Sequence, residues 1–110
     1  MRRGDIFLVK QGTKSDPRKQ RAYAIVSRAA LIESNFSTVI CAPIFSNFEG
    51  LQTQVIVGEP NGLKNPSAVL CDYLVSIEKA KLTNYVGALN SAQMKELNTA
   101  LSTALGLESL

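Results

Sequence analysis

Arg21 is the residue whose type and position best suit chemistry on a phosphate group. It stands at the start of an apolar, β-prone stretch, residues 20–28, and directly behind a segment rich in lysine and arginine. A guanidinium is planar, permanently charged and able to fork onto two phosphate oxygens. A strand that begins with this group behind a basic loop therefore predicts a phosphate-binding edge.

Ser46 is the second candidate, because it ends another apolar stretch, residues 38–47. If the two stretches form neighbouring strands, Arg21 and Ser46 lie within reach of one phosphate. A hydroxyl there can give a hydrogen bond that strengthens as negative charge develops. RNA carries its own nucleophile, the 2′-hydroxyl, so the protein need not supply one. We predict that Arg21 and Ser46 are catalytic, and the general base stays open because arginine has no acceptor.

The composition excludes several other chemistries. The chain has no histidine, so a Ser-His-Asp triad and a pair of imidazoles for RNA cleavage are both excluded. No glycine-rich phosphate loop occurs, which excludes nucleotide hydrolysis of the P-loop kind. Cys41 and Cys71 lie inside apolar runs, where free cysteine behaves as a small core residue. We therefore expect no metal and no cofactor.

Charge is distributed unevenly along the chain. Residues 1–28 hold eight Lys or Arg against two Asp, whereas residues 29–110 hold four against seven acidic residues. This asymmetry favours an anionic partner on the N-terminal third, although a solvated charged loop is the alternative. The Phe45 ring either packs in the core or at a dimer contact, or it stacks on RNA bases. The predicted RNA contacts are Lys14, Arg18, Lys19, Gln20, Arg28, Phe45 and Asn47.

The elements that must position these side chains are mostly strands. Apolar or alternating stretches predict strands, and the segments between them are rich in Gly, Pro, Asn and Ser. Pro43 predicts a bulge or a bend near the end of its strand. The predicted strands are residues 5–10, 22–27, 38–45, 52–57, 67–71 and 74–77, with a helical turn at 29–33 and loops at 11–20 and 58–66. Residues 1–110 thus form one mainly antiparallel β domain.

The last predicted element is a helix that begins after Asn90 and ends before Gly106. Gln93 stands three residues after Asn90, the spacing of a capping box. Apolar residues then recur at helical spacing as Met94, Leu97, Leu101 and Leu105. This stripe serves the core or an interface, and we expect the protein to be a homodimer. No membrane span or signal peptide is evident, so a cytoplasmic protein that does not bind membranes is expected.

The order of these segments resembles the MazF/PemK toxins of bacterial toxin–antitoxin systems. Arg3-Gly4-Asp5-Ile6 is similar to the family's opening, and Arg21 with AYAIVS is similar to its Arg-Pro-apolar strand, with Ala22 in place of the proline. TVICAPI resembles the third strand, and Leu51-Gln52-Thr53-Gln54-Val55 the next. SAVLCDYLVSIEKAKL resembles the segment in which an acidic residue precedes an apolar strand. The resemblance covers nearly the whole chain.

The resemblance implies an SH3-like barrel with a C-terminal helix, working as a homodimer. It implies a metal-independent endoribonuclease that cuts single-stranded RNA to a 2′,3′-cyclic phosphate and a 5′-hydroxyl. It also implies an antitoxin whose acidic, disordered tail occupies the RNA groove, and contact with operator DNA only through the antitoxin complex. The family's essential arginine falls on Arg21 and its essential threonine on Phe45. Asp72 matches the family's acidic position and so joins the predicted RNA contacts, while Tyr73 replaces a common glutamine.

Two alternatives to this function remain open. A CcdB-like gyrase poison shares the fold, but its gyrase contact uses a C-terminal Trp-Gly-Ile, and this chain has no tryptophan. A degenerate homologue that only binds RNA or antitoxin is the other alternative, because Phe45 has no hydroxyl. If the Phe45 ring is dispensable, Phe45→Thr restores the family's hydroxyl and is expected to raise activity.

Overall fold

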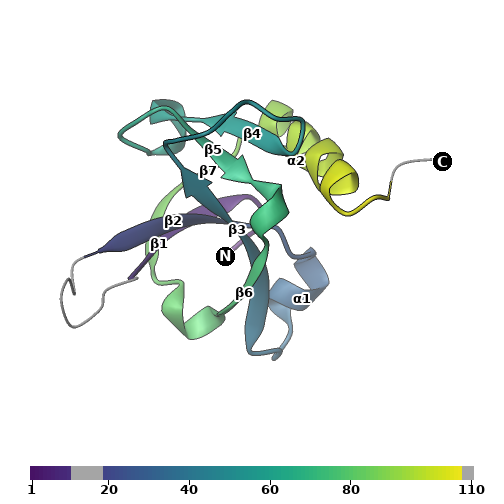
Figure 1. Cartoon of the computed structure of the whole chain (residues 1–110). Coiled ribbons are helices and arrows are strands. Elements are labelled where there is room, and N and C mark those ends of the chain that lie inside the picture. Colours follow the sequence, from purple (N-terminus) through teal and green to yellow (C-terminus); the bar gives the residue numbers. More distant parts are fainter. Residues whose placement is uncertain (11–18, 108–110) are drawn as a thin grey trace.

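The computed structural model describes residues 1–10 and 19–107 of the chain. Short strands joined by antiparallel pairing form a sheet, and one long helix closes the chain (Figure 1). The strands are β1 (Asp5–Lys10), β2 (Gln20–Ile25), β3 (Thr38–Phe45), β4 (Gln54–Val57), β5 (Ser67–Leu70), β6 (Val75–Glu78) and β7 (Asn84–Ala88). The helices are α1 (Ala29–Glu33) and α2 (Ser91–Ala104), with 3-10 turns η1 (Glu59–Asn61), η2 (Cys71–Tyr73) and η3 (Lys79–Lys81).

The strands pair in the order β4-β5-β3-β2-β1-β7, and β6 pairs with β3 beside β5. β3 therefore pairs with β2 along one edge and with β6 and then β5 along the other. The sheet curls into a half-barrel, and α2 packs against its β4 side (Figure 1). The prediction of a mainly antiparallel β fold with a C-terminal helix is confirmed.

Several features of the strands differ from the sequence prediction or were not part of it. The segment after β5 turns through η2, so that β5 pairs with β4 while β6 pairs with the first half of β3. The bulge predicted at Pro43 is wrong for the pairing with β2, whose register is unbroken at Tyr23 and Pro43. The register shift lies instead between Ile6 and Phe7, opposite β7. β7 itself is a strand that the sequence did not predict, because it contains Asn and Gly, which strands disfavour.

The two faces of the sheet bury separate apolar clusters, because side chains alternate along each strand. The cluster on the α2 face includes Ile6, Ala24, Ala42, Val69 and Leu97. The cluster on the other face includes Phe7, Tyr23, Ile25, Val39 and Cys41. Odd-numbered residues of β2 and β3 thus share the second face.

Both cysteines belong to these clusters as free, buried thiols. Burial raises the pKa of Cys41 to about 12. Burial, with a smaller effect from the charge of Asp72, raises the pKa of Cys71 to about 11. Such thiols stay protonated and unreactive near neutral pH, as expected of core cysteines.

The capping prediction for α2 is confirmed in both directions. The Asn90 side chain accepts from the Gln93 backbone amide at 2.8 Å, and the Gln93 side chain accepts from the Asn90 amide at 3.0 Å. Leu97 is fully buried, but Leu105 is 57% exposed at the C-cap and so leaves the predicted stripe. Among the helices that the structure describes, none combines the length and apolar character needed to cross a membrane.

The predicted surface loop between β4 and β5 contains a buried amide that the sequence does not reveal. Asn61 is only 3% exposed. Its side chain donates to the Ala88 carbonyl at 2.9 Å and to the Gln93 side chain at 2.7 Å, and accepts from the Gly58 amide. Gln93 in turn donates to the Ile56 carbonyl. This pair of amides fixes α2 and η1 to β4 and β7.

We expect Asn61→Ala to destabilise the fold by about 1–3 kcal/mol, because it leaves several buried polar groups without partners. Asn65→Ala is the matched control, since Asn65 is exposed and its side chain has no such buried position. Chemical denaturation of both variants measures the free energies of unfolding. Equal stabilities would show that the amide pair contributes nothing.

Candidate functional site

The Arg21 side chain lies against an aromatic ring. Its guanidinium carbon is 3.9 Å from the centre of the Phe45 ring, which is a cation–π distance. One terminal nitrogen, Nη1, donates to the backbone carbonyl of Ile44 at 3.3 Å. Arg21 is half-buried, so the guanidinium is held at the sheet and still meets solvent.

Strand register places the two side chains together. In the register between β2 and β3, Tyr23 lies opposite Pro43. Continued by two residues, this register brings Arg21 opposite Phe45. Residues that face each other across antiparallel strands have Cβ atoms about 5 Å apart. The condition that the Arg21 strand and the third strand are neighbours is therefore met.

η2 supplies the next residues of the site. The Tyr73 ring meets the Phe45 ring edge-on, with centroids 6.4 Å apart and an angle of 80° between the planes. Tyr73 itself is 60% exposed. The neighbouring Asp72 is also exposed, and its carboxylate accepts from the Thr53 hydroxyl at 2.6 Å. The position that the resemblance marks as acidic thus lies one residue from a ring that contacts Phe45.

Ser46 and Asn47 follow β3 directly and are exposed. Ser46 is the chain neighbour of Phe45, so its Cα lies about 3.8 Å from that of the stacked residue. Within the described residues, the partner of the Arg21 guanidinium at this strand end is the Ile44 carbonyl rather than the Ser46 hydroxyl. The structure brings Ser46 to the same end of β3 as Arg21 but gives no direct bond between them.

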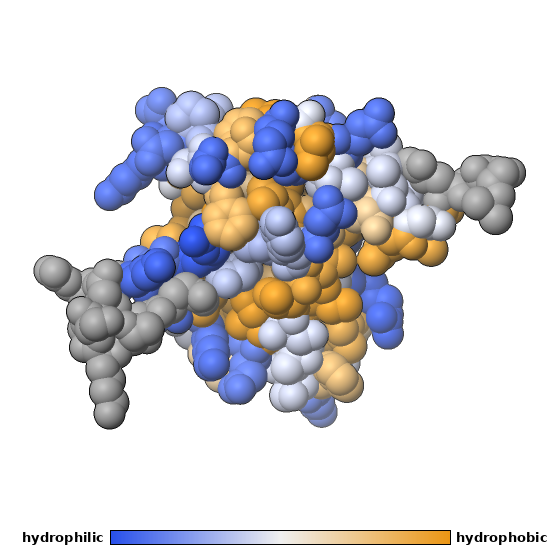
Figure 2. Space-filling view, in the orientation of Figure 1, coloured by the Kyte–Doolittle hydropathy of each residue, from blue (hydrophilic) through white to orange (hydrophobic). Residues whose placement is uncertain are grey.

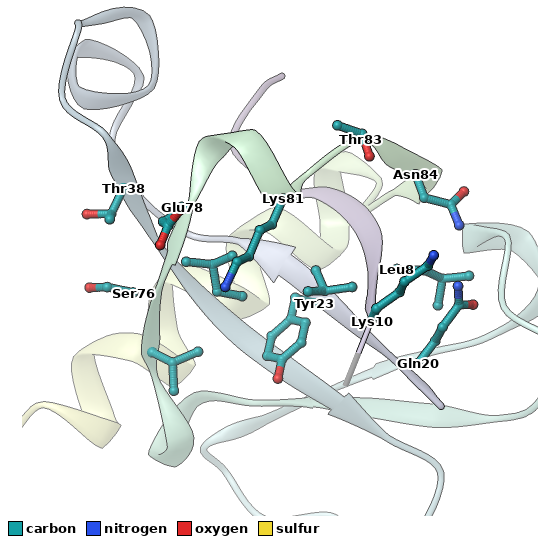
Figure 3. Close-up of a pocket in the computed structure, with 13 residues that line it drawn as sticks. Leu8, Lys10, Gln20, Tyr23, Thr38, Ser76, Glu78, Lys81, Thr83 and Asn84 are labelled. Carbon is teal, nitrogen blue, oxygen red and sulfur yellow. The ribbon is translucent and has the colours of Figure 1, made fainter. Parts of the chain in front are cut away.

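A pocket of about 760 Å³ opens on the sheet beside Arg21. Gln20 and Tyr23, which flank Arg21 on β2, both line it. Figure 3 shows Tyr23 between the Lys10 and Lys81 side chains in this view. Tyr23 also lies on the sheet face that Arg21 shares by strand alternation, about 7 Å away along β2. Arg21 itself does not line the pocket, but its chain neighbour Gln20 does.

The remaining predicted RNA contacts are scattered. Lys19 is exposed and directly precedes β2, close in the chain to Arg21. Arg28 is exposed at the start of α1, beyond the opposite end of β2, so the structure does not bring it to Arg21. Lys14 and Arg18 lie outside the described residues.

Three residues of the site were not among the predicted contacts. The resemblance marks Tyr73 only as a replacement for a glutamine, and its contact with Phe45 depends on η2. Lys10 and Lys81 are 71 residues apart in number yet line one pocket. Lys10 belongs to the basic N-terminal third, which was the available signal, whereas nothing in the local sequence marks Lys81.

The surface also carries exposed apolar side chains. Figure 2 shows a central apolar band on one face, with hydrophilic side chains around it. Ile40, Ile56 and Val75 are each more than two-fifths exposed. A contiguous apolar patch is typical of a surface that another chain covers.

Comparison with known proteins gives one consistent result. Residues 2–105 match the family model described as PemK-like, MazF-like toxin of type II toxin–antitoxin system. The chain is 33% identical over 90 residues to Endoribonuclease MazF3 of Mycobacterium tuberculosis, covering 82% of this chain and 86% of that protein.

Solved structures agree with this match. Mycobacterium tuberculosis toxin MazF-mt6 superposes with a TM-score of 0.81 at 30% identity, covering 96% of this chain and 99% of that one. An endoribonuclease in complex with its cognate antitoxin from Mycobacterial species gives a TM-score of 0.84 at 26% identity, covering 100% and 99%. The chain belongs to the PemK-like, MazF-like toxins of type II toxin–antitoxin systems.

Proposed function

We propose that the protein is an endoribonuclease toxin that cuts single-stranded RNA without a metal. The 2′-hydroxyl of the RNA gives up its proton as its oxygen bonds to the adjacent phosphorus. The bond from phosphorus to the 5′-oxygen breaks, and the 5′-oxygen takes up a proton, so that no proton is gained or lost overall. The products are a 2′,3′-cyclic phosphate and a 5′-hydroxyl. The observation that supports this most is Arg21, a half-buried guanidinium at the end of β2 beside a pocket that two lysines line.

In this proposal Arg21 binds the non-bridging oxygens of the scissile phosphate. Its Nη1 is bonded to the Ile44 carbonyl, which leaves other guanidinium N–H groups for the phosphate. Ser46 adds a hydrogen bond to the charge that develops on the phosphate. The residues proposed to bind RNA are Lys14, Arg18, Lys19, Gln20, Arg28, Asn47 and Asp72. The pocket has room for a nucleotide that flanks the cut.

The proposed partners follow from the same site. An antitoxin with an acidic, disordered tail would compete with RNA for the pocket that Lys10 and Lys81 line. The antitoxin would also carry the toxin to operator DNA. We propose a homodimer, which the exposed Ile40, Ile56 and Val75 support. RNA cleavage that stops translation would act in the cytoplasm.

The test uses purified protein, an excess of EDTA and a mixture of single-stranded RNAs. Mapped ends should carry a 2′,3′-cyclic phosphate and a 5′-hydroxyl. A matched RNA with one 2′-deoxynucleotide before the cut should resist at that position only, because the nucleophile is missing. Cleavage that requires Mg²⁺, or that persists in the deoxy RNA, would contradict the proposal.

The alternatives predict different outcomes of the same test. A CcdB-like gyrase poison leaves RNA intact and inhibits DNA supercoiling by gyrase. A degenerate homologue leaves both reactions untouched and still binds RNA or antitoxin.

We expect Lys19→Ala to weaken RNA binding at every sequence. The slope of log K against log salt concentration should fall by about 0.7 for each phosphate that the variant no longer neutralises. Lys95→Ala is the control, because Lys95 is exposed on α2 and lines a separate pocket with Gln54 and Ile56. Both slopes come from the binding of a 2′-deoxy RNA, which cannot be cleaved. Binding is measured from roughly 50 to 200 mM salt. A slope unchanged by Lys19→Ala would show that this residue binds no phosphate.

A further inference from the structure

Phe45 stands where the family's hydroxyl is expected, yet its ring lies against the Arg21 guanidinium at a cation–π distance. We propose that Phe45 is a positioning residue, which fixes the plane of Arg21 so that the N–H groups on its free edge meet the scissile phosphate. This inference rests on the proposed ribonuclease function. It assigns Phe45 an action through Arg21 rather than on the RNA.

Strand pairing favours this contact. Continued by two residues, the register between β2 and β3 brings Arg21 opposite Phe45, and the guanidinium carbon lies 3.9 Å from the centre of the ring. A leucine or a threonine at 45 would lie at the same place but would offer no ring quadrupole to a cation. The aromatic face is therefore the feature that distinguishes Phe45 at this position.

Three contacts restrain the Arg21 and Phe45 side chains. The Phe45 ring covers one face of the guanidinium at 3.9 Å, and the Ile44 carbonyl accepts from Nη1. Tyr73 in turn meets the Phe45 ring edge-on. An arginine restrained in its plane loses less freedom when it forks onto a phosphate, since its donor geometry is already set.

The burial of Phe45 argues against a role in packing alone. Phe45 is half-buried and belongs to neither apolar cluster. The ring face toward Arg21 is also covered, which leaves less of the ring for stacking on a base. The contact reverses one expectation drawn from the sequence, because Phe45→Thr removes the ring that Arg21 lies against and should lower the rate.

The experiment compares Phe45→Leu, Phe45→Thr and Phe45→Tyr with wild type. Phe36→Leu is the control, because Phe36 is 58% exposed in the turn before β3, at the end of that strand away from Phe45. Single-turnover cleavage at saturating RNA gives the rate, binding of a 2′-deoxy RNA gives the affinity, and a thermal melt reports folding. We expect Phe45→Leu and Phe45→Thr to slow cleavage roughly tenfold, the size of one partly desolvated cation–π contact.

The pattern across variants separates positioning from stability. Phe45→Tyr should retain the wild-type rate, and affinity should fall less than the rate in Phe45→Leu. A rate equal to wild type in Phe45→Leu, or an equal loss in Phe45→Tyr, would overturn the inference. A loss of cleavage rate that parallels the loss of melting temperature in all variants would also overturn the inference.

A second measurement tests the contact without activity. In a proton–nitrogen spectrum, the Arg21 Hε signal should move upfield under the Phe45 ring, and Phe45→Leu should abolish this shift while Phe36→Leu should not. If wild type cuts no RNA, the proposed function fails, and the spectrum still decides whether the ring restrains Arg21. An unshifted signal in the wild type would overturn the inference.

Discussion

Arg21→Lys is expected to reduce the single-turnover cleavage rate by a factor on the order of 10²–10³, the usual cost of removing one stabiliser of developing charge. An ammonium keeps the charge but cannot fork onto two phosphate oxygens. It is also too compact to lie flat on the Phe45 ring while its donor reaches the Ile44 carbonyl, as Arg21 does. The affinity for uncleaved RNA should fall only modestly, because the charge remains.

Arg2→Lys is the matched control, since Arg2 is exposed in the segment before β1. Both variants are measured for rate, for binding of a 2′-deoxy RNA, and for thermal stability. A wild-type rate at saturating RNA in Arg21→Lys would show that Arg21 does not act in the transition state. A loss of affinity together with that wild-type rate would indicate a binding role alone.

Local sequence patterns predicted the elements whose structure depends on neighbours in the chain. The capping box of Asn90 and Gln93 needs only residues three positions apart, and α2 begins where it predicts. The helical turn at Ala29–Glu33 and the strands β1 and β3 also have the predicted bounds. Hydrophobic periodicity is sufficient for such segments.

Elements that depend on distant partners were not predictable in this way. β7 contains Asn84 and Gly87 and is a strand because it pairs with β1, across most of the chain. The Gly87 position also has no room for a side chain, since a Cβ there would meet the backbone carbonyl of Asn61. Asn61 is buried because α2 brings Gln93 to it. None of these contacts leaves a local signal in the sequence.

The candidate site, too, could be predicted only in part from the sequence. Residue chemistry was sufficient to single out Arg21, whereas its pairing with the segment that includes Ser46 was only a condition of the prediction. The stack on Phe45 needed the exact register between β2 and β3, which composition does not determine. The pocket needed Lys10 and Lys81 to come together from segments 71 residues apart in the chain.

Ser46→Ala is the second substitution with a large expected effect. If Ser46 donates a hydrogen bond to the charge that develops on the phosphate, its removal should slow cleavage by a factor on the order of 10²–10³. Stability should stay within about 0.5 kcal/mol of wild type, because an exposed serine contributes little packing. Ser37→Ala is the control, since Ser37 is also exposed but precedes the opposite end of β3.

The double variant Arg21→Lys with Ser46→Ala decides whether the two residues act on one phosphate. Groups that act as a unit lose far less in combination than the product of their separate losses, as mutant enzymes often show. We therefore expect the double variant to be only slightly slower than the worse single variant. Losses that multiply would place Ser46 at an independent contact, since distant sites act additively. A wild-type rate in Ser46→Ala would remove Ser46 from the site and leave the stacked Arg21 as the main source of charge stabilisation.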